Sequence, residues 1–310
     1  MCKMVQYALW SNCCNKCDFC LIRDHYHYSK KEQIENIRQI RENIKHIDWV
    51  NEFSYGVSLL GGELYFVQDK ELQDEFMLLI DDIIENILLK SNNKNCRYSS
   101  VTNGLYDPKF LFRVVDRIKE SVGLGKLDLN FSYDLKYRYH SEDQRLLVLE
   151  NINKFHNRYN YNTGVQMILT QNLINLCKKG LFDVQKFVDE DIPGNTLSFL
   201  YPHPIQTGKV LEDFFFTRED LFWFVNYLKS NCIDAYYNFL YSTKNSGTFK
   251  YTGFKNRTDN GLNDVRQQPV LSDGKETLSP CGHSVLYKCY SDSNKCMLCD
   301  LEKLEQDILS

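Results

Sequence analysis

The chain has 310 residues, of which 43% are hydrophobic and 25% are charged, a composition typical of a globular protein with a sizeable core. Its net charge of −4 gives no general attraction to polyanions, which argues against a nucleic-acid partner. We see no signal peptide and no apolar run approaching a membrane span, so we expect a cytoplasmic protein without a membrane partner. Twelve cysteines without a secretion signal indicate metal ligands rather than disulfides.

Short apolar or alternating runs are followed, again and again, by amphipathic runs along most of the chain. We expect strands over residues 5–10, 54–60, 97–102, 127–134, 163–170 and 196–202. We expect helices over residues 30–47, 69–90, from Asp107-Pro108 onward, 141–158, 181–190 and 218–230. Six strand–helix units in strict alternation predict an α/β fold with a parallel sheet, and six units are too few for a closed eight-unit barrel.

The composition first changes near residues 241–280, which are rich in Ser, Thr, Gly, Asn and Asp. Such a segment is typical of loops or short hairpins. A cysteine-rich tail follows it. We therefore predict two domains, the α/β domain over residues 1–235 and a C-terminal extension over residues 236–310.

A Cys-x3-Cys-x2-Cys spacing, made by Cys13, Cys17 and Cys20, directly follows the first expected strand. Three thiolates this close suit an iron–sulfur cluster better than structural zinc, which takes four protein ligands. A [4Fe–4S] cluster with three cysteine ligands leaves one iron open for a substrate or cofactor. Two alternatives remain: a ferredoxin-type reading that uses Cys14 with Cys17 and Cys20, and half of a zinc site.

This motif, with the aromatic Phe19 just before the third cysteine, resembles the signature of the radical S-adenosylmethionine (SAM) superfamily. The resemblance implies that the open iron binds the amino and carboxylate groups of SAM. It implies that one electron then cleaves SAM to a 5′-deoxyadenosyl radical. It also implies that the sheet is a partial (β/α)6 barrel of the TIM type, and that a reductant such as flavodoxin or ferredoxin supplies the electron.

Further candidate residues lie at expected strand ends, where ligands bind in parallel α/β folds. Gly61-Gly62-Glu63 resembles the family's glycine-rich turn, whose backbone and carboxylate receive the SAM ammonium group. Thr102-Asn103-Gly104 resembles the segment near the SAM ribose. Ordinary tight turns are the alternative for both segments. The resemblance implies further SAM contacts from the backbone of Phe19 and from Ser132, Asp134, Gln166 and Tyr201.

Four more cysteines, Cys281, Cys289, Cys296 and Cys299, follow a Cys-x7-Cys-x6-Cys-x2-Cys spacing near the end of the sequence. Four thiolates complete the coordination of zinc or of a second [4Fe–4S] cluster. The set resembles the Twitch-type form of the SPASM extension, although it has fewer cysteines than the full SPASM pattern and a shorter first interval. We therefore expect an auxiliary cluster, with zinc as the alternative. The remaining cysteines are expected to be ordinary, partly buried residues, namely Cys2, Cys14, Cys96, Cys177 and Cys232.

Together these patterns predict a radical SAM enzyme that abstracts hydrogen from its substrate. The SPASM/Twitch-like tail favours a peptide or protein side chain as substrate. One alternative is a nucleotide or another small molecule, as in viperin-like radical SAM enzymes. An alternative of another class is a non-enzymatic binding module in which zinc or a cluster has a purely structural role. The sequence names no further catalytic residue.

Overall fold

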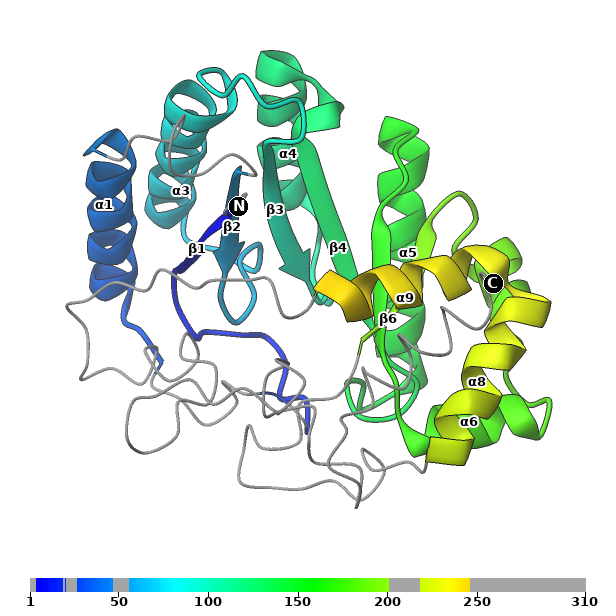
Figure 1. Ribbon diagram of the computed structural model, residues 1–310. Coiled ribbons are helices and arrows are strands. Elements are labelled where there is room, and N and C mark those ends of the chain that lie inside the picture. Colours follow the sequence, from blue (N-terminus) through cyan, green and yellow to red (C-terminus); the bar gives the residue numbers. More distant parts are fainter. Residues whose placement is uncertain (1–3, 19, 21–26, 47–55, 201–217, 246–310) are drawn as a thin grey trace, which may run out of the picture.

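The computed structural model describes residues 4–18, 20, 27–46, 56–200 and 218–245. Its centre is a sheet of six parallel strands that neighbour one another in chain order (Figure 1). The order never reverses, which distinguishes this sheet from a doubly wound one and matches the succession of strands in a TIM-type barrel. The predicted class, an open α/β sheet of the partial-barrel type, is confirmed. The strands are β1 (Met4–Ala8), β2 (Gly56–Leu60), β3 (Arg97–Thr102), β4 (Leu127–Tyr133), β5 (Gly164–Ile168) and β6 (Thr196–Leu200).

Most of the helices lie where the amphipathic runs predicted them. They are α1 (Lys30–His46), α3 (Lys70–Ile83) with its π-helical continuation η1 (Ile84–Leu88), α4 (Lys109–Val122), the 3-10 turn η2 (Leu124–Lys126), α5 (Glu142–Tyr159), α6 (Gln171–Lys178), α7 (Val184–Lys186) with the π-helical turn η3 (Phe187–Asp191), α8 (Arg218–Asn231) and α9 (Ile233–Asn245). The carboxylate of Asp69 caps α3 by accepting a hydrogen bond of 3.0 Å from Leu72 N.

Two helices were not predicted, and one helix start was placed incorrectly. Helix α6 begins at once after β5 because Thr170, expected to end the strand, caps it and accepts from Leu173 N at 3.1 Å. Helix α9 packs along β6, where Asn238 Nδ2 donates to Leu197 O at 3.1 Å. Helix α4 begins at Lys109 with Pro108 at its cap position, slightly later than the expected start at Asp107-Pro108.

Side chains alternate across the sheet, and the two faces have different chemistry. The first face packs on the helices: Phe131 of β4 meets Phe155 of α5, and Phe199 of β6 meets Phe224 of α8. The opposite face carries polar, half-buried side chains, among them Asn130. Because a closed TIM barrel fills its interior with branched apolar residues, this polar face is suited to line a ligand site instead. Its polar members on β3 to β6 include Ser99, Asp128, Asn130, Ser132, Gln166 and Ser198.

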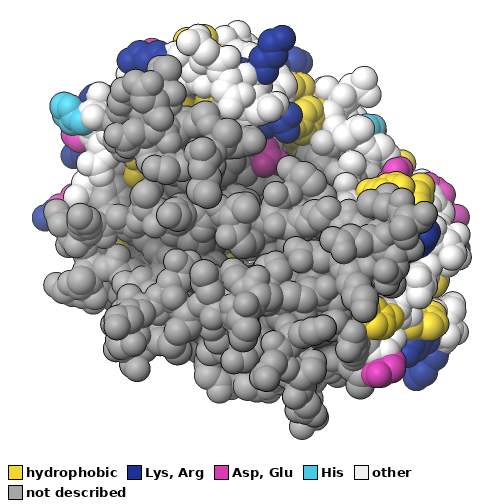
Figure 2. All heavy atoms as spheres, viewed as in Figure 1, with side chains coloured by type: hydrophobic (Ala, Val, Ile, Leu, Met, Phe, Trp, Pro, Cys, Tyr) yellow, Lys and Arg dark blue, Asp and Glu magenta, His cyan; other side chains and the backbone are white. Residues whose placement is uncertain are grey.

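The outer helices are joined by ion pairs on the surface. Arg117 of α4 pairs with Asp81 of α3 at 2.6 Å, and Arg158 of α5 pairs with Asp116 of α4 at 2.8 Å. Figure 2 shows Lys and Arg side chains along the upper rim, away from the end toward which the arrows of β3 and β4 point in Figure 1. Exposed pairs of this kind contribute at most about 1 kcal/mol each. None of the helices in the described part of the chain is long and apolar enough to cross a bilayer.

Candidate metal and cofactor site

The cysteine loop, of which residues 9–18 and 20 are described, leaves β1 and runs past the C-terminal ends of the strands (Figure 1). Its first residues form backbone hydrogen bonds with the end of β2 and with the turn that follows, which extends the pairing of β1 with β2. Leu9 N donates to Leu60 O at 2.8 Å, Gly62 N donates to Trp10 O at 2.9 Å, and Glu63 N donates to Asn12 O at 2.9 Å. The predicted glycine-rich turn and the cysteine motif are therefore neighbours in space.

The two glycines of this turn allow the close approach. A Cβ atom on Gly62 would lie 2.2 Å from Asn12 O and 2.4 Å from Ser11 O, which are backbone atoms and cannot move aside alone. A Cβ atom on Gly61 would lie 2.9 Å from Trp10 O. The chain itself thus requires glycine at residue 62, because the turn touches the start of the cysteine loop.

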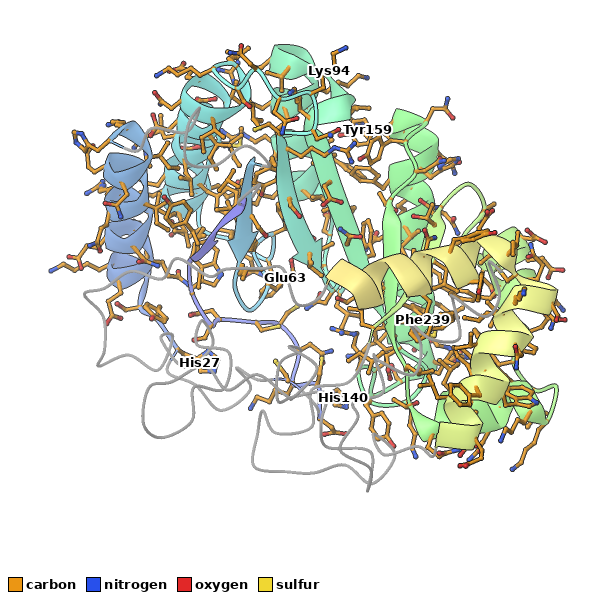
Figure 3. The ribbon with its side chains drawn as sticks, viewed as in Figure 1. His27, Glu63, Lys94, His140, Tyr159 and Phe239 are labelled. Carbon is orange, nitrogen blue, oxygen red and sulfur yellow. The ribbon has the colours of Figure 1, made fainter. Side chains whose placement is uncertain are left out.

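Glu63 lies between the sheet and the cysteine loop (Figure 3) and is only 1% exposed. Its Oε1 accepts hydrogen bonds from Thr102 Oγ1 at 2.9 Å and Tyr65 N at 3.2 Å, while its Oε2 accepts from Asn103 N at 2.6 Å. Burial raises the pKa of Glu63 to about 7, because the loss of hydration outweighs these three hydrogen bonds. The carboxylate predicted to receive the SAM ammonium group is engaged here by the protein's own donors.

Asn103, at the end of β3, connects the glycine-rich turn to the cysteines. The residue is 5% exposed, and its Nδ2 lies 3.5 Å from both Cys13 Sγ and Cys14 Sγ. Its Oδ1 accepts from Leu105 N at 2.8 Å, which fixes the amide orientation. Three motifs that are far apart in the sequence, at residues 13–20, 61–63 and 102–104, therefore meet at one place.

Cys13 and Cys14 differ in their preferred protonation states. The pKa of Cys13 is lowered to about 6, first by a hydrogen bond with Cys14 and further by Asn15 N, Arg138 and Asn103, against the effect of burial. The pKa of Cys14 is raised by the same hydrogen bond and by burial. Because they share this hydrogen bond, the two thiols titrate as a pair, and one thiolate of the pair is available as a ligand.

Asp134, at the end of β4, holds the segment of residues 135–140 against the cysteine loop. Asp134 is 3% exposed, and its Oδ1 accepts from the backbone N–H groups of Lys136 at 2.7 Å, of Tyr137, and of Arg138 at 3.3 Å. Burial raises its pKa. The carbonyl groups of that segment in turn accept from the cysteine loop. Asp18 N donates to Tyr137 O at 3.1 Å, and Asn15 Nδ2 donates to Arg138 O at 2.6 Å.

Cys17 is the most enclosed of the four clustered cysteines, with 5% exposure. Its Sγ lies 3.3 Å from Asn15 Nδ2 and 3.7 Å from Nη1 of Arg138. Burial raises the pKa of Cys17 to about 11, although the charge of Arg138 acts in the opposite direction. Cys20 N donates to Cys17 O at 3.1 Å. Sequence reasoning missed Asn15 and Arg138, because neither belongs to a recognisable motif.

The remaining predicted residues either lie on the polar face of the sheet or fall outside the described part of the chain. Ser132 and Gln166 are half-buried neighbours across β4 and β5 on the polar face of the sheet. Phe19 and Tyr201 lie outside the described residues, and so do the four C-terminal cysteines, Cys281, Cys289, Cys296 and Cys299. Of the cysteines expected to be ordinary, Cys96, Cys177 and Cys232 are buried.

The donor chemistry of the loop fits an iron–sulfur cluster. Cys13, Cys17 and Cys20 form no disulfide, and N–H groups are directed at the sulfurs of Cys13 and Cys17. Such hydrogen bonds are the usual surroundings of cluster ligands. Within the described part of the chain, no three His, Cys, Asp or Glu side chains are grouped so that they could hold a metal ion.

No family model and no curated protein sequence matches this chain. Among solved structures, the chain is similar to the crystal structure of Streptococcus suis SuiB, with a TM-score of 0.45 and 14% sequence identity. The match covers 81% of this chain and 49% of the other, so this chain spans about half the length of that solved chain. A likeness this weak carries no argument about fold or function.

Proposed function

We propose that this chain is a radical SAM enzyme whose [4Fe–4S] cluster is held by Cys13, Cys17 and Cys20. One observation carries the proposal: the cysteine loop lies at the C-terminal ends of an open parallel sheet. Donors from the loop itself and from the segments after β3 and β4 are directed at its sulfur atoms. Ligand sites of parallel α/β folds lie at this edge. When bound there, the cluster and SAM would supply a 5′-deoxyadenosyl radical that abstracts hydrogen.

In this proposal, the chain's own residues bind SAM and orient it. Ser132 and Gln166 are half-buried and point their polar groups from the same face of the sheet, which suits contact with the polar parts of SAM. The backbones of Gly61 and Phe19, and the side chain of Tyr201, remain proposed contacts. Glu63 and Asp134 hold the surrounding segments through their buried carboxylates, and both remain proposed contacts of SAM.

The proposed substrate is a peptide or protein side chain, and its support is the resemblance of the C-terminal cysteine set to a Twitch-type extension. That set would hold an auxiliary [4Fe–4S] cluster, with zinc as the alternative. A reductant such as flavodoxin or ferredoxin would supply electrons. Because α9 packs along β6, we propose that the extension begins after Asn245.

A small polar molecule, such as a nucleotide, is the second candidate substrate. The observation in its favour is the polar, half-buried face of the sheet. The side chain of Asn130 on this face lies directly over Gly164, where a Cβ atom would come within 2.0 Å of Asn130 Oδ1. Ser99 Oγ and Asn130 Nδ2 both donate to the carboxylate of Asp128, so this face offers an ordered set of polar groups. A short peptide reading frame adjacent in the genome would favour the first substrate, and nucleotide-metabolism neighbours would favour the second.

The enzyme proposal is tested by anaerobic reconstitution followed by assays for iron, zinc and 5′-deoxyadenosine released on adding dithionite. Cys17→Ser is expected to abolish release. Cys177→Ser is the matched control, because both cysteines are 5% exposed and Cys177 lies on α6. Release by the native chain and by Cys177→Ser, but not by Cys17→Ser, supports the proposal. A folded native chain that binds no iron and releases no deoxyadenosine leaves the binding-module alternative.

A further inference from the structure

Arg138 brings a positive charge to the buried sulfur of Cys17. Its Nη1 lies 3.7 Å from Cys17 Sγ, at hydrogen-bonding distance for sulfur. Its backbone is held from two sides, because Arg138 N donates to Asp134 Oδ1 at 3.3 Å and Arg138 O accepts from Asn15 Nδ2 at 2.6 Å. The side chain is half-buried. The guanidinium group is therefore placed by the fold rather than by a chance surface contact.

Of the donors to cysteine sulfur described above, Arg138 alone is charged. Asn103 donates to Cys13 and Cys14, and Asn15 donates to Cys17, but both carry neutral amides. A guanidinium group keeps its charge at every accessible pH, and a charge removed from water acts more strongly on its neighbours. Net charge and hydrogen bonds to sulfur are the main protein influences on the reduction potential of an iron–sulfur cluster.

We infer that Arg138 is a positioning residue for Cys17 whose charge raises the reduction potential of the cluster held by the three-cysteine loop. The inference rests on the proposed function. One electron, supplied by a protein reductant or by dithionite, makes such a cluster more negative by one charge. A fixed cation beside one of the ligands therefore stabilises the reduced state more than the oxidised state. Without Arg138 the cluster would be harder to reduce.

The test compares midpoint potentials of the reconstituted full-length chain, determined by redox titration followed by electron paramagnetic resonance. The signal that changes on adding SAM belongs to the three-cysteine cluster, so any auxiliary cluster does not confuse the result. Arg138→Gln is expected to lower the midpoint potential, and Arg138→Lys, which keeps the charge, is expected to restore most of it. Lys136→Gln is the control, because Lys136 is exposed on the same segment and its removal changes the net charge equally.

The outcomes separate the two proposals. A native chain without a SAM-responsive signal overturns the enzyme proposal itself. A native signal, with full iron content and equal midpoint potentials in Arg138→Gln, Arg138→Lys and Lys136→Gln, overturns the role of Arg138 alone. A lowered potential in Arg138→Gln alone supports both its contact and its charge effect.

A second measurement needs no substitution, and so it covers the case in which Arg138→Gln fails to fold. The native chain is labelled with 15N in the guanidinium group of arginine, and pulsed resonance is recorded on its reduced, SAM-responsive cluster. A guanidinium nitrogen in contact with a ligand sulfur is expected to show a hyperfine coupling to the cluster. Absence of any arginine coupling, with the backbone couplings of a 15N-labelled control present, would overturn the inference.

Discussion

At the scale of single residues, two buried carboxylates hold the surroundings of the cysteine loop. Glu63 joins the end of β2 to the end of β3, where Asn103 reaches the sulfurs of Cys13 and Cys14. Asp134 shapes the segment after β4, which meets Asn15 and Cys17. Each acid accepts backbone N–H groups in a place with almost no access to water. Both therefore order segments that lie against the loop carrying the candidate ligands.

Glu63 makes stability depend on pH in a defined direction. Its pKa is about 7 in the folded chain, above its ordinary value of 4.5, so the folded state binds the proton more tightly than the unfolded state. Stability therefore falls as pH rises from about 4.5 through 7, by about 3 kcal/mol for this group. Glu63→Gln does not titrate there and is expected to show a correspondingly flatter profile in urea unfolding of the metal-free, reduced chain.

The matched control for this pH profile is Glu71→Gln, which removes a carboxylate from the exposed first turn of α3. It is expected to leave the pH profile of the native chain unchanged. A Glu63→Gln variant whose unfolding free energy varies with pH as steeply as that of the native chain would show that Glu63 is ionised normally.

The sequence predicted the residues that belong to a spaced motif or stand at the end of an expected strand. It did not predict residues that reach the site only because the folded chain brings distant segments together. The cysteine, glycine-rich and Thr102-Asn103-Gly104 motifs were all selected, and the structure brings all three together. Arg138 follows Asp134 by four residues, and no periodicity indicates that its side chain contacts a cysteine 121 positions away. Cys14 was expected to be ordinary, yet it shares Asn103 with Cys13.

At the scale of elements, the turn between β2 and α3 is packed against the start of the cysteine loop. Gly62→Ala would drive a Cβ atom to 2.2 Å from Asn12 O, so the loop or the turn must shift. We expect a loss of about 1–3 kcal/mol, as for overpacked sites in general, and reduced iron uptake on reconstitution. Urea unfolding and iron analysis measure the two effects. Gly125→Ala is the control, since its Cβ would meet nothing within 4 Å; equal effects at both glycines would contradict this packing.

The strands and long helices could be predicted because a buried face repeats along each of them. In α1, Ile34, Ile37, Ile40 and Ile44 are all buried as the period required. The short elements could not be predicted this way. Thr170 follows an apolar run, which predicts a strand, but its side chain caps α6 by accepting a hydrogen bond from Leu173 N. The apolar pattern alone does not reveal this cap. Helix α9 crosses the expected domain boundary at residue 235 because its apolar side is covered by β6 and α8.

At the scale of the whole molecule, α9 covers the last strand of the open sheet. Phe239 of α9 is fully buried (Figure 3), and its ring lies 6.4 Å from that of Phe224 in α8. Phe239→Ala is expected to cost about 3–5 kcal/mol in thermal or urea unfolding. Tyr237→Ala, on the exposed side of the same helix at 59% exposure, is expected to change stability by less than about 0.5 kcal/mol. Equal effects would mean that α9 does not pack on this domain.

The C-terminal cysteine set decides how many metal centres the molecule carries. Serine at all four positions, Cys281, Cys289, Cys296 and Cys299, removes every thiolate of that set while the loop at residues 13–20 keeps its own. If the set holds an auxiliary cluster, reconstituted iron is expected to fall from about eight to about four per chain. If it holds zinc, iron stays at about four and zinc falls from about one to zero. Because the deoxyadenosyl radical is proposed to arise at the N-terminal loop, dithionite-dependent release of 5′-deoxyadenosine should persist in either case. Unchanged iron and zinc would show that these four cysteines bind no metal, and loss of both metals together with release would show that the two cysteine sets form one interdependent unit.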